Sequence, residues 1–147
     1  MINSFRNEYF FLSNFYPCEI TDPLTGLTFQ NAEAMFQSYK CISLEERERF
    51  CNLSAKDAKA LGRRVKLRTD LDWNENRDLF MFSTLVAKFT QHPQLMKKLE
   101  KTHPHDLVEG NTWNDTYWGV CNGKGENRLG ELLMDIRILY ATDYYKK

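Results

Sequence analysis

The sequence predicts an α+β fold: a predominantly helical, compact single domain with a small antiparallel β element. Three features of the 147-residue chain lead to this prediction. Residues 4–30 are rich in aromatic side chains and turn signals, the rest of the chain repeats apolar residues at helical spacing, and no repeat or linker interrupts it. A chain of this length can bury one hydrophobic core without disulfides, so we expect one domain over residues 1–147.

The composition is that of an ordinary globular protein, with 42% hydrophobic and 27% charged residues. Because the formal net charge is zero, no overall field attracts nucleic acid, and any contact with DNA or RNA has to be local. The four cysteines show no CxxC spacing, so we expect free thiols, no metal site and no cofactor. No apolar run approaches membrane-spanning length and the first residues do not resemble a cleavable leader, so we expect a soluble, cytoplasmic protein without a membrane partner.

Residues 4–30 are expected to form the small antiparallel ribbon. Pro17 breaks the string SFRNEYFFLSNFYP, and DPLTGLTF offers a Pro-x-x-Gly turn between two short extended pieces. Asn14 and Phe15 lie in this stretch and have two interpretations. Either Phe15 packs in the core while Asn14 satisfies a turn, or both side chains line a pocket.

Residues 31–41 (NAEAMFQSYKC) predict a helix capped by Asn31. Spacings of three, four and seven place four of its side chains on one helix face: Glu33, Phe36, Gln37 and Lys40. Such a face suits a core poorly, because ionised groups are costly to bury unless they are paired or take part in chemistry. Taken alone, the stretch favours a solvated face with a weak Glu–Lys pair, and a functional site is the alternative.

Two short helices are expected next, over SLEERERF (43–50) and SAKDAKALG (54–62), the second with Ser54 as N-cap and Gly62 as its stop. Four cations follow closely: Arg63, Arg64, Lys66 and Arg68. This concentration of basic residues suits phosphate binding, although a solvated strand edge would look the same.

Residues 73–91 predict a long core helix whose inward residues are Leu79, Phe82, Leu85, Val86 and Phe89. It ends at His92, and Pro93 is well placed to begin the next helix, PQLMKKLEKT. DLVEGN (106–111) then predicts a short strand that leads to a turn.

The last third of the chain contains DTYWG (115–119) and GKGENRLG (123–130). A glycine-rich loop entering a helix can hold a phosphate or diphosphate, but a Gly-Lys-Gly loop with Asn127 as N-cap is also an ordinary helix start. Asp115 either favours a turn or contacts a ligand, and Trp118 and Trp73 either stack on a flat ligand or pack in the core. The amphipathic helix that follows is expected to bury Leu129, Leu132, Leu133, Ile136, Leu139 and Tyr140.

Five strings in this order resemble the NADAR family, also called YbiA-like: FLSNFYP, NAEAMFQSYK, AKALGRRVKLR, KFTQHPQL with LVEGN, and NDTYWGVCNGKGENRLGELLM. The resemblance covers nearly the whole chain. It implies a compact, mostly helical α+β fold and an N-glycosidase, a hydrolase of the bond between ribose C1 and a nitrogen. It also implies one of two substrate classes: ADP-ribosylated guanine in nucleic acid, or the ribosylamino-pyrimidine phosphates of the early riboflavin pathway.

The strings look more like those of stand-alone family members that act on ADP-ribosyl-guanine. We therefore expect this chain to remove ADP-ribose from ADP-ribosylated guanine in nucleic acid. The alternatives are hydrolysis of a nucleotide-like riboflavin intermediate and non-catalytic binding of ADP-ribose or another nucleotide. Two departures from relatives are Ala34, where a His can follow the glutamate, and Thr69-Asp70-Leu71-Asp72 ahead of Trp73, which leaves the substrate preference near Trp73 open.

Carried over to this chain, the family motifs give the expected site. The acid falls on Glu33 and the lysine on Lys40, and Asp115 is the third expected catalytic residue. Cleaving a ribosyl N-glycoside needs stabilised charge at C1, a nucleophile and a proton for the departing nitrogen. We favour Lys40, with a pKa lowered by burial and a nearby arginine, as the amine that attacks, and Glu33 as its acid–base partner, although their roles could be exchanged. The expected substrate-binding residues are Asn14, Phe15, Phe36, Gln37, Arg63, Arg64, Trp73, Trp118, Gly119, Gly125, Asn127 and Gly130.

Overall fold

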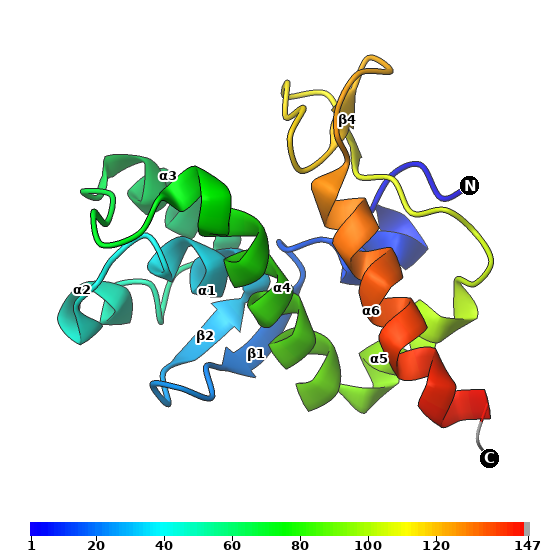
Figure 1. Ribbon diagram of the computed structural model, residues 1–147, viewed down its shortest axis with the longest axis horizontal. Coiled ribbons are helices and arrows are strands. Elements are labelled where there is room, and N and C mark those ends of the chain that lie inside the picture. The colour runs from blue at the N-terminus through cyan, green and yellow to red at the C-terminus, as the bar shows by residue number, and fades with distance from the viewer. Residues whose placement is uncertain (146–147) are drawn as a thin grey trace. The chain divides into compact units, whose positions relative to one another are not determined.

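The computed structural model describes residues 1–145, and the side chains of residues 1–141. The chain divides into two units: a central unit, Asn14–Gln91, and a terminal unit made of Met1–Ser13 and the chain from His92 onward. Helices dominate both units, and the central unit also contains a two-stranded antiparallel ribbon (Figure 1). The predicted helix-rich α+β fold with a small antiparallel β element is confirmed.

The central unit begins with the ribbon. Strand β1 (Pro17–Thr21) pairs antiparallel with β2 (Thr28–Asn31), with Ile20 opposite Phe29 and an irregular register between Pro17 and Ile20. Ile20 and Phe29 are completely buried, because alternation along each strand turns one face of the ribbon towards the helices.

Four helices complete the central unit: α1 (Ala32–Ser38), α2 (Leu44–Glu48), α3 (Ala55–Arg64) and α4 (Trp73–Gln91). Helix α1 contacts both strands and the other three helices (Figure 1), and all seven of its residues are buried. Met35 of α1 packs in a common core with Phe29 and Phe50, each with no exposed surface. The polar side chains of α1 are therefore held on an enclosed element.

The terminal unit contains a 3₁₀ helix, η1 (Asn7–Leu12), and two packed helices, α5 (Pro93–Lys101) and α6 (Arg128–Tyr145). Two short parallel strands, β3 (Gly110–Asn111) and β4 (Val120–Cys121), join the loops between these helices. The backbone of Ile2 exchanges hydrogen bonds with Asp106 and Val108, which attaches the start of the chain to this unit.

Some local predictions were wrong. The ribbon does not extend over residues 4–30, because residues 7–12 form η1 and the first strand begins only at Pro17. Leu79 and Leu139, expected inward, are 61% and 57% exposed. Gly62 does not end its helix, since α3 continues to Arg64. Within residues 1–145 no helix is long and apolar enough to cross a membrane.

Candidate active site

Helix α1 is started by the cap that the sequence predicts. The side-chain oxygen of Asn31 accepts a hydrogen bond from the Ala34 N–H at 2.8 Å, and its side-chain nitrogen donates to Leu53 O at 3.1 Å. The helix ends at Ser38, but the Lys40 N–H still donates to Gln37 O at 3.1 Å. The helical turn thus continues far enough to keep Lys40 close to the face that carries Glu33 and Gln37.

Glu33 and Gln37 form a buried polar pair. Each is only 7% exposed, and Gln37 Nε2 donates to Glu33 Oε1 at 2.8 Å. The alternative of a solvated surface face with a weak Glu–Lys pair is wrong, because the acid is enclosed. Burying a carboxylate costs free energy, so its position is typical of a group used in chemistry.

Gln37 also explains the glycine that interrupts α3. A Cβ atom at Gly62 would overlap Gln37 Oε1 and lie 2.6 Å from its Cδ. Gln37 Oε1 is buried and has no hydrogen-bond partner among the described residues. A buried acceptor that lacks a hydrogen-bond donor costs free energy. This oxygen can therefore accept a hydrogen bond from a donor on a ligand.

Lys40 lies beside the same glycine. Its Nζ donates to Gly62 O at 3.1 Å and lies 6.0 Å from the ring centroid of Trp73. Burial lowers the pKa of Lys40, Glu33 raises it, and Arg63 lowers it further. The predicted lowering of the Lys40 pKa by burial and a neighbouring arginine is confirmed.

Aromatic rings line the neighbourhood of Lys40. Trp73, the first residue of α4, lies 5.5 Å from the Phe36 ring and stacks on Phe80 at 5.6 Å, and Phe80 in turn stacks on Tyr39 at 4.8 Å. Phe36 is 4% exposed, whereas Trp73 is half-buried. Trp73 therefore has more accessible surface than Phe36 for a flat ligand.

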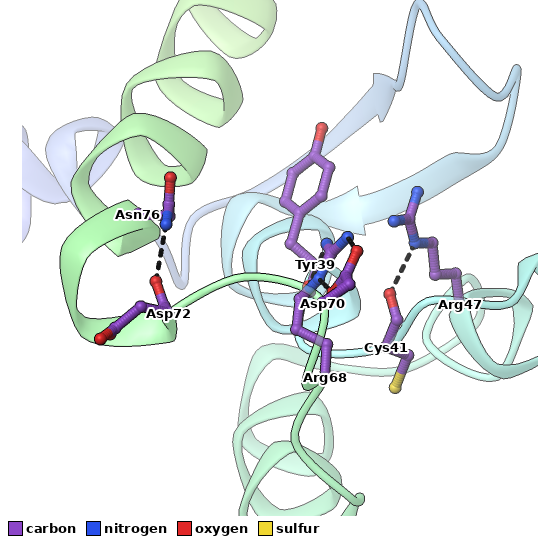
Figure 2. Close-up of polar contacts among 7 residues, drawn as sticks. All are labelled: Tyr39, Cys41, Arg47, Arg68, Asp70, Asp72 and Asn76. Atoms are coloured by element: carbon purple, nitrogen blue, oxygen red, sulfur yellow. Dashed lines mark hydrogen bonds and ion pairs between the residues drawn. The ribbon is translucent and has the colours of Figure 1, made fainter.

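The four cations after Gly62 have different surroundings. Arg68 is held by the protein: its Nη1 donates to Tyr39 O at 3.0 Å, and its Nε and Nη2 donate to the two carboxylate oxygens of Asp70 (Figure 2). The side chains of Arg63 and Arg64 are exposed and make no hydrogen bond or ion pair with another described residue. Together with Lys66, which is also exposed, they are the cations of this cluster that can reach a phosphate.

Asn14 and Phe15 lie at the start of the central unit. The backbone oxygen of Asn14 accepts from the Glu33 N–H at 3.0 Å, and its side-chain nitrogen contacts Met81 Sδ at 3.3 Å. Asn14 is 6% exposed and its Oδ1 has no partner within residues 1–141. Phe15 is 38% exposed. Asn14 Oδ1 is therefore, after Gln37 Oε1, a second buried acceptor of the central unit that lacks a hydrogen-bond donor.

Asp115 and Trp118 belong to the terminal unit, in the loop between β3 and β4. Asp115 Oδ1 accepts hydrogen bonds from the N–H groups of Tyr117 at 3.2 Å and Trp118 at 3.0 Å, which is the turn role the sequence allowed. Trp118 is half-buried and packs edge-on against Tyr117 at 4.8 Å.

The glycine-rich loop before α6 is tied to the same turn. The N–H groups of Glu126, Asn127, Arg128 and Leu129 donate to the carbonyls of residues 116–119. Asn127 does not cap α6 with its side chain, which instead bonds to Glu109 N and Leu107 O, both at 2.9 Å. A Cβ at Gly130 would overlap Leu107 O, and one at Gly119 would overlap Glu109. These contacts fix the glycine-rich loop and use the N–H groups of residues 126–129. A phosphate bound at the loop would therefore need other hydrogen-bond donors.

A model of the NADAR domain family matches residues 3–139 of the chain. The chain belongs to the NADAR family. It is 37% identical over 142 residues to N-glycosidase YbiA of Escherichia coli strain K12, an alignment that covers 95% of this chain and 87% of that protein. It is also 33% identical over 131 residues to a riboflavin biosynthesis protein of Vibrio vulnificus, covering 86% of this chain and 34% of that one.

A solved relative has the same fold. The NMR structure of the E. coli protein YbiA superimposes with a TM-score of 0.84 at 34% sequence identity, covering all of this chain and 90% of that one. The NADAR resemblance found in the sequence is therefore confirmed. The expected site residues of this NADAR chain fall in both units: Glu33, Gln37 and Lys40 in the central unit, and Asp115 with Trp118 in the terminal unit.

Sequence reasoning missed three features of the site. The role of Gly62 beside Gln37 depends on how α1 and α3 pack, which no local signal reveals. The side chain of Asp72 accepts a hydrogen bond from the Glu75 N–H at 3.2 Å and so caps the start of α4 at Trp73. An acid three residues before the N–H that it accepts from is a capping signal that the sequence contains. Lys88 on α4 is completely buried, and burial lowers its pKa to about 8, with Cys18 acting in the opposite direction. Within the described residues no group of three or more His, Cys, Asp or Glu side chains could hold a metal ion.

Proposed function

We propose that this NADAR protein removes ADP-ribose from ADP-ribosylated guanine in nucleic acid by hydrolysing the bond between ribose C1 and the base nitrogen. The chain is a hydrolase of N-glycosyl bonds: relatives from E. coli, Nostoc punctiforme and mimivirus are all named N-glycosidases. The guanine substrate is the finer part of the proposal, and the resemblance of the sequence strings to ADP-ribosyl-guanine members supports it. We also propose that residues 1–147 act as one N-glycosidase domain.

The observation that supports catalysis best is the buried cluster of Glu33, Gln37 and Lys40. Burial lowers the pKa of Lys40, so its neutral amine forms at lower pH than that of an exposed lysine. Glu33 is enclosed and hydrogen-bonded by Gln37. An amine and a carboxyl group on one face of α1 and the turn that follows it match the two groups that a glycosidic cleavage needs.

In the proposed mechanism the neutral Lys40 Nζ attacks ribose C1. A C1–Nζ bond forms, the C1–base bond breaks, and its electron pair goes to the base nitrogen, which takes a proton from the carboxylic acid of Glu33. The Glu33 carboxylate then takes a proton from the C1–NζH2+ group and gives it to the ring oxygen as the C1–O4′ bond breaks, which leaves a protonated imine between C1 and Lys40. Water adds to C1, the C1–Nζ bond breaks, and the proton released returns to Glu33, which frees ADP-ribose and restores the neutral amine and the carboxylic acid. Asp115 is proposed to hold a ribose hydroxyl.

The remaining proposed residues would bind the substrate. The side-chain oxygens of Asn14 and Gln37, which lack hydrogen-bond donors among the described residues, can accept from the hydroxyl or N–H groups of a nucleotide. Trp73, Trp118, Phe15 and Phe36 offer aromatic surfaces for a base. The exposed Arg63 and Arg64 suit the diphosphate. Gly119, Gly125, Asn127 and Gly130 are proposed to contact the substrate without holding its phosphates, because the N–H groups of residues 126–129 already donate within the terminal unit.

A second candidate substrate is a ribosylamino-pyrimidine phosphate. The similarity to the riboflavin biosynthesis protein of Vibrio vulnificus favours it, because this chain aligns with that protein over 131 residues. Such a substrate has the same ribose-to-nitrogen bond, so the proposed roles of Glu33 and Lys40 would not change. A non-catalytic nucleotide reader, in contrast, would not need both groups.

The deciding experiment offers the two substrates separately. The protein is incubated with guanine-ADP-ribosylated single-stranded DNA and with the ribosylamino-pyrimidine phosphate, and the release of ADP-ribose or ribose phosphate is measured. Release of ADP-ribose is the expected result, and release from the pyrimidine alone would contradict the guanine proposal. Glu33→Gln serves as the matched control, because it keeps the acceptor for Gln37: it should bind the substrate but release nothing, whereas an unimpaired Glu33→Gln would contradict the catalytic role.

A further inference from the structure

A cavity in the terminal unit lies apart from every residue assigned above. It has a volume of about 640 Å³ and is lined by residues of α5, the segment after it and α6: Lys97, Glu100, Lys101, His103, Arg137, Ile138 and Ala141. This volume is in the range of pockets that hold a small organic ligand. Nothing in the proposed glycosidase chemistry uses it.

The lining of this cavity is basic. Lys97 and Lys101 are four residues apart on α5, so they share one face of the helix. Both are exposed, and neither forms an ion pair with another described residue. Like charges at this spacing repel each other, and Glu100 is the only acid among the described residues of the lining. An anion in the cavity would relieve this repulsion.

Arg137 supplies a buried cation to the same cavity. It is only 6% exposed, and its Nη1 donates to Thr102 Oγ1 at 2.9 Å and to His105 O at 2.8 Å. Its Nε is buried without a hydrogen-bond partner among the described residues, and none of them accepts a bond from Nη2. The charge of Asp106 acts on Arg137, but no described carboxylate forms a hydrogen bond or ion pair with it. A buried guanidinium without a bonded carboxylate is costly, and its fork matches the oxygens of a phosphate.

The other wall of the cavity is apolar. Ile138, which is 66% exposed, and Ala141 follow Arg137 on α6. A site that binds only an anion needs no apolar surface, whereas a flat ring can pack against such a surface. We propose that the α5–α6 cavity binds a mononucleotide, with its phosphate between Lys97, Lys101 and Arg137 and its base against Ile138 and Ala141.

The test follows amide signals of the whole protein in ¹⁵N–¹H correlation spectra during titration. The probes are a nucleoside 5′-monophosphate, the corresponding nucleoside and inorganic phosphate. We expect saturable shifts at residues 97–103 and 137–138 with the monophosphate, weaker binding of phosphate at the same amides, and none with the nucleoside. Shifts at residues 33–40 would report the proposed active site separately, so this proposal and the glycosidase proposal can fail independently.

Lys97→Gln with Lys101→Gln tests the assignment without disturbing the buried arginine. This double variant should weaken binding of the monophosphate about tenfold, as expected for two charge-assisted contacts. Arg49→Gln with Lys56→Gln removes the same charge from exposed positions of the central unit and should leave the affinity unchanged. The proposal is overturned by equal losses in both double variants, by equal binding of the nucleoside, or by no saturable shift at these amides up to about 10 mM ligand.

Discussion

Lys40 is the residue on which the proposed chemistry depends most directly, because only its neutral form can attack a sugar carbon. Burial lowers its pKa from the ordinary value of 10.5, so the neutral amine appears at lower pH than in an exposed lysine. Because Lys40 must be neutral and Glu33 protonated, we predict a bell-shaped pH profile of kcat/KM whose maximum lies below the ordinary lysine pKa of 10.5. The measurement is a pH profile of ADP-ribose release; a maximum at or above the ordinary lysine pKa would contradict it.

Replacing Lys40 gives the companion result. Lys40→Ala and Lys40→Arg should each lose at least about a hundredfold in kcat/KM, since alanine has no amine and arginine stays charged. Borohydride added with substrate should trap the wild-type protein at Lys40. Lys56→Ala, at an exposed position of α3, is the control and should keep full activity. An active Lys40→Ala variant without any trapped adduct in the wild type would exclude the covalent role.

Gly62 gives a prediction about packing. A Cβ at this position overlaps the amide of Gln37, which is only 7% exposed and has little room to move. Gly62→Ala should lower the free energy of unfolding by about 1–2 kcal/mol, despite the better helix propensity of alanine. Urea unfolding measures this effect. The added variant Gln37→Ala should recover part of the loss in a double-mutant cycle, and additive losses would show that the two side chains do not clash.

At the residue scale the sequence could predict the polar face of α1 but not its burial. Periodicity alone grouped Glu33, Phe36, Gln37 and Lys40, because helical geometry fixes which side chains are neighbours. Whether that face meets water depends on the helices packed over it, so this stretch taken alone favoured a surface pair, and only the motifs elsewhere in the chain favoured a site. Gly62 shows the same limit, since its partner lies on another helix.

At the scale of elements, the segment between α3 and α4 holds the turn that contains Lys40. The Arg68 N–H donates to Lys40 O at 2.8 Å and its guanidinium donates to Tyr39 O, while Asp70 holds the other side of the guanidinium (Figure 2). Arg68 also lies 5.3 Å from the Phe80 ring. Asp70, in the segment Thr69 to Asp72, therefore helps to build the surroundings of Lys40 by holding Arg68.

The contacts of Arg68 and Asp70 predict that substituting these two residues changes the free energy of unfolding by unequal amounts. Arg68→Ala removes the bond to Tyr39 O and the contact with Phe80, and should lower the free energy of unfolding by about 1–3 kcal/mol. Asp70→Asn should have a smaller effect, because Asp70 is exposed. Urea unfolding compares the variants, and an equal or larger loss in Asp70→Asn would contradict this order.

Acid titration tests the same pair. The hydrogen bond from Arg68 holds the pKa of Asp70 below its ordinary value of 3.8. The pair thus stabilises the fold above pH 3.8 and loses that contribution as the pH falls through the lowered pKa. Asp70→Asn should remove this part of the acid dependence.

Element boundaries followed from the sequence where caps defined them, as at Asn31 and Ser54, whose side chains accept from Ala34 N and Asp57 N. The sequence did not show which faces of the long helices are buried. In α4 the run Leu79 to Phe82 is apolar throughout, so periodicity could not decide which residue turns inward. The structure buries Met81 and leaves Leu79 exposed, because packing against Asn14 and β1 sets the rotation of the helix.

At the scale of the whole molecule, the family motifs were enough to predict the fold class, because they span most of the chain. The division into a central and a terminal unit was not predictable, since it depends on contacts between Met1–Ser13 and the chain after His92. The motif residues near the C-terminus show the consequence. Asn127, Gly119 and Gly130 looked like a phosphate loop, yet the bonds and close contacts of the terminal unit account for them.

Asp115 is the residue of the terminal unit that tests whether catalysis needs more than the Glu33–Lys40 cluster. Its Oδ1 accepts from Tyr117 N and Trp118 N, and an asparagine oxygen can accept the same two bonds. Asp115→Asn should therefore keep the free energy of unfolding within about 0.5 kcal/mol but lower kcat/KM by about tenfold or more if the charge holds a ribose hydroxyl. Asp115→Ala, which loses the turn bonds as well, should unfold more easily by about 1 kcal/mol. Full activity in Asp115→Asn would limit this residue to the turn and leave the reaction to Glu33 and Lys40.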